Sequence, residues 1–588
     1  MSQPFYSIKM NTKSIVSKSL LFVSLLIFFL FAIYVLYINR VVLYTAQDRS
    51  EFLIGSSFFS TLMMKPFGLI QYVAAWLTQF LYKPFVGASL LVAIWALIFF
   101  VGIKAFRLKG SAFALMLLPI ACLLTSLVDL GYWIYEFMIR GYWFSQSVGY
   151  LLMLTLLWGA RSTSRKWHVF WYILGFCLYP ILGWFALLFI LCLALSDKLT
   201  WREFLGLLLV VSAAVVWRAL LYSNIKFDDV IFAGLPKFET ASDKSDYLSI
   251  PFWIIGVLSI LYVTLSRYLD KWFVPVLCVI AGIAFTWSLM YQDKNYINEM
   301  RMARSAEADN WKEVLEIYSE TSKPTISMLM LKNVALMNEG GILDRSFKMG
   351  NDFIPIYNPD SVHISFLEIA SSVSYYNYGM INEGFRLTFE CAEQAGFSPF
   401  YLRMLCRSAY ANGEKELVER FTKLIHGHPY YADWKPSPVS KKVRELQKCY
   451  SDELTGVENS DRYIMNSISL WTESDSKLAS EQALFYSMMR CDSRRFWKSL
   501  RSFLKCHQGE EFPLHAQEAY IMYMEKAPEA KRVMLPVGQV TYDRYKKFWT
   551  ILENHVNSGL DRETTAEKMR SEFGDTYWFY NIFARKFL

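Results

Sequence analysis

Acidic residues that could act as general bases occur beside arginines in two loops between long apolar segments. They are Asp48, Arg49 and Glu51 in the first loop and Asp129, Glu136 and Arg140 in the second. A carboxylate can take a proton from a hydroxyl nucleophile, and a guanidinium can bind a phosphate. Arg218, near the end of another apolar segment, is a further phosphate ligand unless its side chain only reaches for the membrane interface. The alternative to a role in catalysis or phosphate binding is that all of these residues are charged side chains exposed to solvent in the loops.

Familiar catalytic motifs are missing from the sequence. It contains no phosphate-binding G-x-x-x-x-G-K-[ST], no G-x-G-x-x-G, no H-E-x-x-H and no G-x-S-x-G. His426 and His428 are two residues apart, so they would not share one face of a helix. The nine cysteines form no C-x-x-C pair. We therefore predict no metal site from the residues themselves.

Long apolar segments fill the first half of the chain and predict membrane-spanning helices, each of which needs about 20 residues. The predicted spans are 15–38, 86–104, 111–130, 146–160, 203–222, 251–266 and 272–291. A further stretch, 167–196, has Pro180 at its middle and is either one kinked helix or a hairpin. A cleaved signal peptide is the less favoured interpretation of the first segment, because no A-x-A site follows it.

The basic residues between the apolar segments decide whether 167–196 is one kinked helix or a hairpin. With the N-terminus in the cytoplasm and a hairpin at Pro180, the short basic loops at 104–109, 161–166, 198–202 and 267–271 all fall on the cytoplasmic side. We therefore predict nine spans and an extracytoplasmic location for residues 292–588. The stretch 66–82 is amphipathic and aromatic, which predicts a helix in the membrane interface. It either packs as a surface helix or covers a lipid-borne substrate.

The second half, residues 292–588, has helical periodicity and a polar composition. Gly379 and Gly413 are 34 residues apart, the repeat length of tetratricopeptide arrays, and each is followed by an amphipathic stretch. The predicted class is all-α, with a polytopic domain at 1–291, a tetratricopeptide-like solenoid at 292–430 and a further helical region at 431–588. The concave face of such a solenoid binds a protein or peptide partner.

The net charge of +8 is mild for 588 residues. We recognise no basic stripe interleaved with aromatic residues, so a nucleic-acid partner is not expected.

Three stretches carry a resemblance to a family. They are Lys65–Tyr72 (KPFGLIQY), Thr78–Ala88 (TQFLYKPFVGA) and Gly379–Gly384 (GMINEG). On these stretches the whole chain resembles an uncharacterised family of multi-span inner-membrane proteins from Bacteroidota with a tetratricopeptide-like C-terminal half. The resemblance implies the bacterial inner membrane, a cytoplasmic N-terminus and a periplasmic C-terminal domain. It implies no activity.

The membrane half is also similar in layout to GT-C glycosyltransferases, which take sugars from polyprenyl-phosphate donors. This resemblance implies that Asp48 or Glu51 is the first-loop acid and that Asp129 or Glu136 is the second. Arg218, Arg49 or Arg140 would meet the lipid phosphate, and a divalent metal would assist the leaving group. The paired acidic motif of those enzymes is not evident in this sequence. Fold-level likeness is weak evidence of function.

Two functions follow as expectations. The first is a GT-C-like transferase on the outer face, whose helical repeats hold the acceptor or a partner. The alternative is a non-enzymatic membrane-anchored scaffold for an envelope protein assembly. Nine spans exceed what an anchor needs, which favours the transferase, whereas the lack of a clear acidic motif favours the scaffold. A transporter is less favoured, because no pair of broken helices occurs in corresponding halves.

Overall fold

The structure, a computed structural model, is all-helical, and every regular element in the described residues is an α- or 3-10 helix. The described residues are 4–135, 140–196, 200–236, 248–265, 270–322, 324–351, 364–449, 475–525 and 534–583. They fall into two compact units. The first unit is Met1–Asp293 with Glu393–Leu402 and Thr422–Trp434, and the second unit is Lys294–Ala392, Arg403–Phe421 and Lys435–Leu588.

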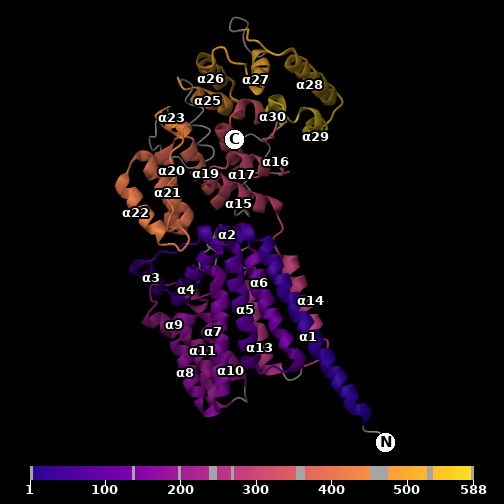
Figure 1. Cartoon of the computed structure of the whole chain (residues 1–588), viewed down its shortest axis with the longest axis vertical. Helices are drawn as coiled ribbons and strands as arrows, with labels where there is room; N and C mark the ends of the chain where they lie inside the picture. Colours follow the sequence, from indigo (N-terminus) through magenta and orange to yellow (C-terminus); the bar gives the residue numbers. More distant parts are fainter. Residues whose placement is uncertain are drawn as a thin grey trace. The chain divides into compact units, whose positions relative to one another are not determined.

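The first unit is a bundle of apolar helices that run alongside one another (Figure 1). Their bounds are α1 (Pro4–Ile38), α5 (Pro84–Phe106), η2 (Gly110–Met116), α6 (Leu117–Val128), α7 (Tyr142–Ser162), α8 (His168–Cys177), α9 (Tyr179–Leu182), α10 (Trp184–Leu195), α11 (Trp201–Leu220), α13 (Ile250–Leu265) and α14 (Val274–Leu289). Short elements between them are η3 (Gly131–Tyr135), η4 (Arg165–Trp167) and α12 (Phe227–Ile231). Each apolar segment expected from the sequence coincides with one or more of these helices.

Four described helices are long and apolar enough to cross a membrane: Lys18–Ile38, Pro84–Phe106, Gly110–Val128 and Trp201–Leu220. Counting Val274–Leu289 with the helix after it as one span gives up to five. Large apolar side chains point outward from these helices, and Phe22 and Val211 are 67% and 77% exposed. An apolar surface of this kind is suited to lipid rather than water. The nine predicted spans are not confirmed, because several of the apolar helices are shorter than a bilayer core requires.

The stretch 167–196 folds back on itself. A Cβ atom on Gly175 of α8 would lie 2.8 Å from the Phe189 side chain of α10, so the two helices run side by side. The chain turns at Gly183, whose φ of +55° is a conformation that side chains with a Cβ rarely adopt. The carbonyl of Pro180 accepts a hydrogen bond of 2.8 Å from the Phe67 amide, which brings the turn against the first loop. The predicted hairpin is therefore present, although its arms have only 10 and 12 residues.

Basic loops gather at the other end of the bundle. Arg161, at the end of α7, donates a hydrogen bond of 2.7 Å to the Ala105 carbonyl at the end of α5. Arg165 pairs with Glu203 at 2.9 Å, and Glu203 belongs to the capping box that begins α11. These contacts hold together three of the loops that the charge pattern assigns to one side. The side of the membrane that this end faces stays a prediction.

The first loop contains more structure than the sequence predicted. It forms α2 (Arg40–Arg49), α3 (Ser56–Met63), α4 (Gly68–Thr78) and η1 (Gln79–Tyr82), of which only the last two match the predicted helix at 66–82. Helix α4 packs against α7 and leaves Val73 and Trp76 partly exposed. Gly141, just before α7, permits this packing, because a Cβ there would lie 2.2 Å from the Ala75 amide nitrogen.

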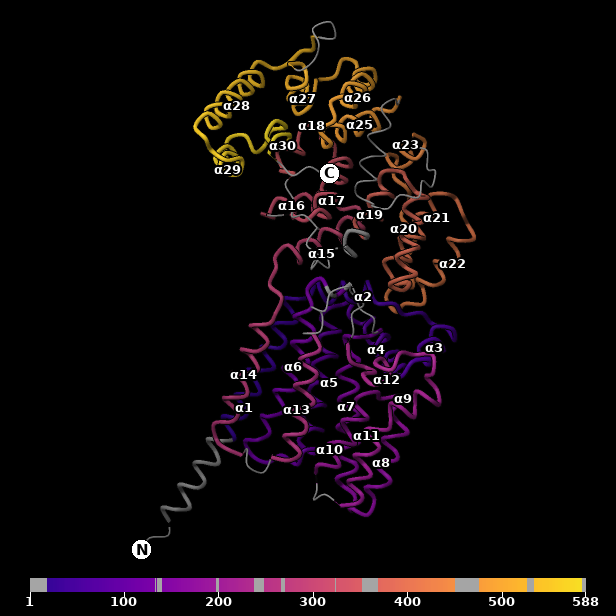
Figure 2. Tube along the Cα trace, turned by 180° about the vertical axis from the view of Figure 1, so that it is seen from behind, coloured from indigo at the N-terminus to yellow at the C-terminus, as the bar shows by residue number. Residues whose placement is uncertain are grey.

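The second unit is also helical in its described residues. Its helices are α15 (Lys294–Glu307), α16 (Trp311–Ser319), α17 (Ile326–Glu339), α18 (Ile342–Arg345), α19 (Ile364–Asn377), α20 (Ile381–Ala395), α21 (Pro399–Asn412), α22 (Lys415–His426), α23 (Lys441–Cys449), α25 (Lys477–Met489), α26 (Ser493–Cys506), α27 (Leu514–Glu525), α28 (Gln539–Asn557), α29 (Arg562–Phe573) and α30 (Tyr577–Phe583). The first unit takes the end of α20, the start of α21 and the end of α22. Figure 2 shows the same helices from behind.

Two glycines and an aromatic run fix local features of the second unit. Gly379 and Gly413 have φ of +76° and +79° and separate α19 from α20 and α21 from α22. A glycine in this conformation ends a helix without steric cost. The aromatic run from Tyr577 to Tyr580 is buried in α30, and the Trp578 indole donates to the Glu518 carbonyl at 2.8 Å. The run is therefore docked into the core of the second unit.

Substituting Gly141 by Ala should destabilise the first unit. The variant would place a methyl group against the α4 backbone and strain a residue with φ of +70°, at a cost of about 2 kcal/mol or more. We expect the buried thiol of Cys192 to react with a maleimide at a lower temperature in the full-length protein in detergent.

Gly559→Ala is the matched control. Gly559 has the same φ of +70° but no atom within 4 Å of a new Cβ. It should cost only the backbone strain, about 1 kcal/mol, and should leave Cys192 labelling unchanged. Equal effects of both variants on Cys192 would refute the close packing of α4 on α7.

Candidate functional site

The two first-loop acids point to partners within the first unit. Asp48 lies in α2 and is 5% exposed, and its Oδ1 accepts a hydrogen bond of 3.4 Å from the Tyr431 hydroxyl. The same hydroxyl lies 3.4 Å from Gln47 Oε1. A buried carboxylate is stable only when polar groups replace its water. The segment Thr422–Trp434 therefore supplies part of the surroundings of Asp48.

Glu51 forms an ion pair and a hydrogen bond with two different stretches of the chain. Its Oε2 lies 3.1 Å from Arg140 Nε, and its Oε1 accepts a hydrogen bond of 3.1 Å from the Phe397 amide. Arg140 in turn donates from Nη1 to the Ala395 carbonyl at 2.5 Å. Gly396 lies between the Ala395 carbonyl and the Phe397 amide, and a Cβ there would come within 2.5 Å of Glu51 Oε2. The ion pair thus clasps the turn between α20 and α21.

Aromatic contacts surround these polar ones. The guanidinium of Arg49 stacks over the Phe400 ring at 3.7 Å, a cation–π arrangement. The Tyr82 ring stacks on Tyr430 at 5.0 Å and meets Tyr431 edge-on at 5.1 Å. The first loop therefore contacts both returning segments, Glu393–Leu402 and Thr422–Trp434, through charged and aromatic side chains. We call this set of contacts the clasp.

Asp129 is placed differently. It follows α6, is 8% exposed, and its Oδ1 has no hydrogen-bond partner among the described residues. Burial raises the pKa of this carboxyl above its ordinary range. It forms no hydrogen bond or ion pair with Asp48, Arg49, Glu51 or Arg140. The second-loop acid is therefore separate from the clasp.

The other two predicted site residues do not join either group. Arg218 is exposed at the end of α11, where its Nε donates to the Ile225 carbonyl at 3.2 Å and its guanidinium lies 5.9 Å from the Phe227 ring. It forms no ion pair with Asp48, Glu51 or Asp129, the three acids that the structure describes. Glu136 lies outside the described residues. The predicted association of a first-loop acid with Asp129 and Arg218 is thus not present among the described contacts.

Metal ligation finds no support among the described residues, which contain no group of three His, Cys, Asp or Glu that could hold an ion. His426 Nε2 lies 2.8 Å from the Trp434 carbonyl, whereas His428 is buried with Nδ1 3.2 Å from Gln79 Oε1. The two imidazoles have different partners, as their spacing indicated.

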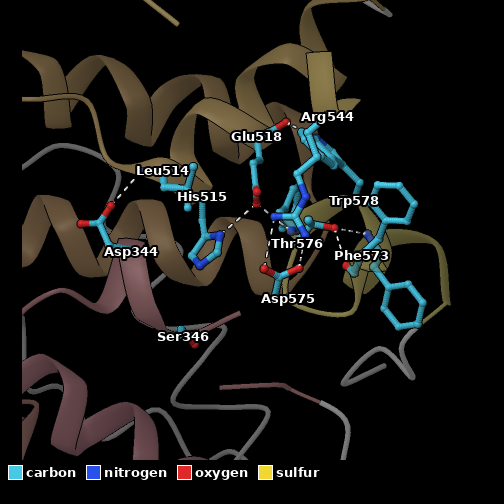
Figure 3. Close-up of polar contacts among 12 residues, drawn as sticks. Asp344, Ser346, Leu514, His515, Glu518, Arg544, Phe573, Asp575, Thr576 and Trp578 are labelled. Atoms are coloured by element: carbon cyan, nitrogen blue, oxygen red, sulfur yellow. Dashed lines mark hydrogen bonds and ion pairs between the residues drawn. The ribbon is translucent and has the colours of Figure 1, made fainter. Parts of the chain in front are cut away.

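Two buried polar groups in the second unit were not predicted from the sequence. His515 Nδ1 lies 2.8 Å from Glu518 Oε2 (Figure 3). The same carboxylate oxygen accepts a hydrogen bond of 2.8 Å from the Tyr577 amide. Lys332 is fully buried, and its Nζ donates to Asn351 Oδ1 at 2.7 Å and to the Gly350 carbonyl at 2.9 Å. Burial lowers the pKa of Lys332. The i, i+3 spacing of His515 and Glu518 was the only signal in the sequence.

These two groups are structural rather than catalytic. Both side chains of the His515–Glu518 pair are 2% exposed or less, so no substrate reaches them in this conformation. The pair ties α27 to the buried α30, and Lys332 ties α17 to the segment that follows α18. Each satisfies a polar group that would otherwise be costly in the core.

The class defined by this fold is an all-helical protein with several helices that could cross a membrane and a second helical unit. The chain belongs to DUF6057, a family of unknown function, whose model matches residues 15–584. No curated protein and no solved structure matches the chain. The expectation of an uncharacterised family spanning the chain is confirmed. Origin in Bacteroidota and similarity to GT-C enzymes stay predictions.

Replacing Glu51 should loosen the segment Glu393–Leu402. Glu51→Gln keeps an acceptor for the Phe397 amide but loses the ion pair, and Glu51→Ala loses both. We expect hydrogen exchange at 393–402 to accelerate in the order wild type, Gln, Ala, which corresponds to a local loss of about 1–3 kcal/mol for the Ala variant. Unchanged exchange in the Ala variant would contradict the clasp.

Glu481 of α25 gives a prediction for pH dependence. Burial raises the pKa of this partly buried carboxyl to about 7, while Lys442 acts in the opposite direction. Because the folded protein then binds a proton more tightly than the unfolded chain, Glu481 lowers stability progressively as pH rises from about 4.5 to 7. Glu481→Gln should therefore stabilise the full-length protein by about 1–2 kcal/mol at pH 8 and have little effect at pH 4.5.

Thermal unfolding of the full-length protein in detergent at the two pH values measures this difference. Glu553→Gln, which changes the same charge at an exposed position of α28, is the control. A stabilisation by Glu481→Gln that is equal at both pH values would contradict the buried acid.

Proposed function

We propose that this protein is a multi-pass scaffold of the bacterial inner membrane that holds a helical protein-binding unit. In this proposal the N-terminus is cytoplasmic and residues 292–588 are periplasmic. The observation that carries the proposal is the clasp. Asp48, Glu51, Arg49 and Arg140, the residues best suited to chemistry by type, contact the protein's own segments 393–402 and 422–434. Groups used in this way hold the chain together and are not free for a substrate.

Helix pairing in the second unit supports the binding role. Helices α19 and α20, then α21 and α22, form two successive pairs, each broken at a glycine, and the glycines are 34 residues apart. Tetratricopeptide-like pairs of this length stack into a surface that binds protein segments. We assign the second unit this role and place its partner in an envelope assembly.

A GT-C-like transferase is the second candidate, and Asp129 is the observation that favours it. A buried carboxyl with an oxygen lacking a partner among the described residues has the character of a general base. In that function Asp129 would take the proton of an acceptor hydroxyl while a sugar leaves its polyprenyl phosphate. A divalent metal could assist the departing phosphate.

Photocrosslinking in cells separates the two functions. A photoreactive phenylalanine replaces Tyr410 of α21 or Tyr542 of α28, which are 41% and 40% exposed. The scaffold predicts a discrete protein adduct from at least one position, and it predicts the same adduct yield after Asp129→Asn. The absence of any protein adduct, together with accumulation of a lipid-linked saccharide in the Asp129→Asn strain, would contradict the scaffold and favour the transferase.

A further inference from the structure

Helix α26 carries a stripe of positive charge on its exposed side. The stripe consists of Arg494, Lys498, Arg501 and Lys505, all exposed. Their spacing of four, three and four residues places them on one face of the helix. The stripe is about 16 Å long at the helical rise of 1.5 Å per residue.

Few acids neutralise this stripe. Lys505 lies 2.8 Å from Asp475, whereas Arg494, Lys498 and Arg501 form no ion pair with a described residue. The nearby acid Asp492 caps the helix and pairs with Arg495 at 3.5 Å. The positive field is therefore concentrated on the first three turns of α26.

Arg490, two residues before the helix cap, gives an independent sign of that field. Its Nε is buried and has no hydrogen-bond partner among the described residues. Burial, and then the neighbouring Arg495, lower the pKa of Arg490, whereas Asp492 acts in the opposite direction. A partly buried cation beside another cation is stabilised when a further anion joins it.

We propose that the stripe on α26 binds an acidic segment of a protein partner. The inference rests on the proposed scaffold function and specifies the chemistry of its partner. Arginine and lysine clusters on rigid helices recognise carboxylate-rich segments through charge-assisted hydrogen bonds. An extended acidic segment of five or six residues matches a stripe of about 16 Å.

The buried face of α26 argues against a membrane or a nucleic acid as the partner. Phe496 and Phe503 are 0% and 4% exposed, and the Phe496 ring packs on Tyr523 at 5.0 Å. An interfacial helix needs apolar side chains free to insert into lipid, and single-stranded nucleic acid needs exposed rings on which bases stack. Phe496 and Phe503 pack into the core that α26 forms with α25 and serve neither purpose. The Trp497 ring packs edge-on against Tyr520 of α27 at 5.9 Å.

The test uses the full-length protein in nanodiscs of zwitterionic lipid at low salt. The probe is a fluorescent peptide of about eight residues rich in Asp and Glu, beside its Asn and Gln counterpart. We expect the wild type to bind the acidic peptide and not the amide peptide. The triple variant Arg494→Gln, Lys498→Gln, Arg501→Gln should bind it about tenfold more weakly or worse.

Two matched variants keep the result specific. Lys415→Gln, Arg420→Gln and Lys423→Gln remove the same charge from exposed positions of α22, among Glu414, Glu416 and Glu419, and should change the affinity less than twofold. Arg494→Lys, Lys498→Arg and Arg501→Lys keep the charge and should retain most of the binding. Failure of the wild type to bind the acidic peptide, or equal loss in the α22 variant, overturns the proposal. A triple-variant defect seen only with phosphatidylglycerol vesicles also overturns it.

The crosslinking experiment distinguishes this inference from the scaffold itself. If the triple variant keeps the full yield of the protein adducts at Tyr410 and Tyr542, the scaffold stands and the α26 stripe is not its docking site. If those adducts disappear with the stripe, the inference is supported. If the wild type forms no adduct at all, the scaffold fails, and the inferred partner fails with it.

Discussion

The ion pair between Glu51 and Arg140 joins three stretches of chain that are far apart in sequence. Arg140 and the Ala395 carbonyl are separated by 255 residues, and Glu51 and the Phe397 amide by 346. Both charged side chains are largely buried, at 13% and 24% exposure. Buried charges cost stability unless they are paired and hydrogen-bonded, and here each charge also holds a backbone group. The rest of the clasp, from Arg49 to Tyr431, depends on the segments that this pair holds in place.

Much of the fold could be predicted from local pattern. Each apolar segment expected from hydropathy coincides with a helix, Pro180 and Gly183 mark the hairpin, and Gly379 and Gly413 end helices where their spacing placed them. The number of spans could not be predicted in this way. Hydropathy shows which residues avoid water, but it does not show whether a short helix such as α10 crosses a bilayer or ends within it. Helices α2 and α3 were not predicted from the sequence, because polar and apolar residues are mixed in the loop that contains them.

The candidate site shows where sequence reasoning reaches its limit. Residue type indicated Asp48, Glu51, Arg49 and Arg140, and all four lie in or beside the clasp. Apart from the Glu51–Arg140 pair itself, their partners lie more than 250 residues away, and no periodicity or spacing connects such distant groups. The sequence grouped Asp129 and Arg218 with these four residues only because all were predicted to lie on the same side of the membrane. Among the described contacts, neither forms a hydrogen bond or an ion pair with any of the four. The α26 stripe was missed even though basic and aromatic residues are interleaved in its sequence, and only burial shows that Phe496 and Phe503 face inward.

A disulfide between the first loop and the second returning segment tests the clasp most directly. A Cβ on Gly427 would lie 3.9 Å from the Cβ of Ile54, within the range that a disulfide requires. Ile54→Cys with Gly427→Cys should crosslink rapidly under mild oxidation of the purified full-length protein. Ile54→Cys alone, or with Gly413→Cys, should not, since a Cβ on Gly413 has no atom within 4 Å. Equal crosslinking of the two pairs, or none in the first, would contradict the clasp and return Asp48 and Glu51 to the residues available for catalysis.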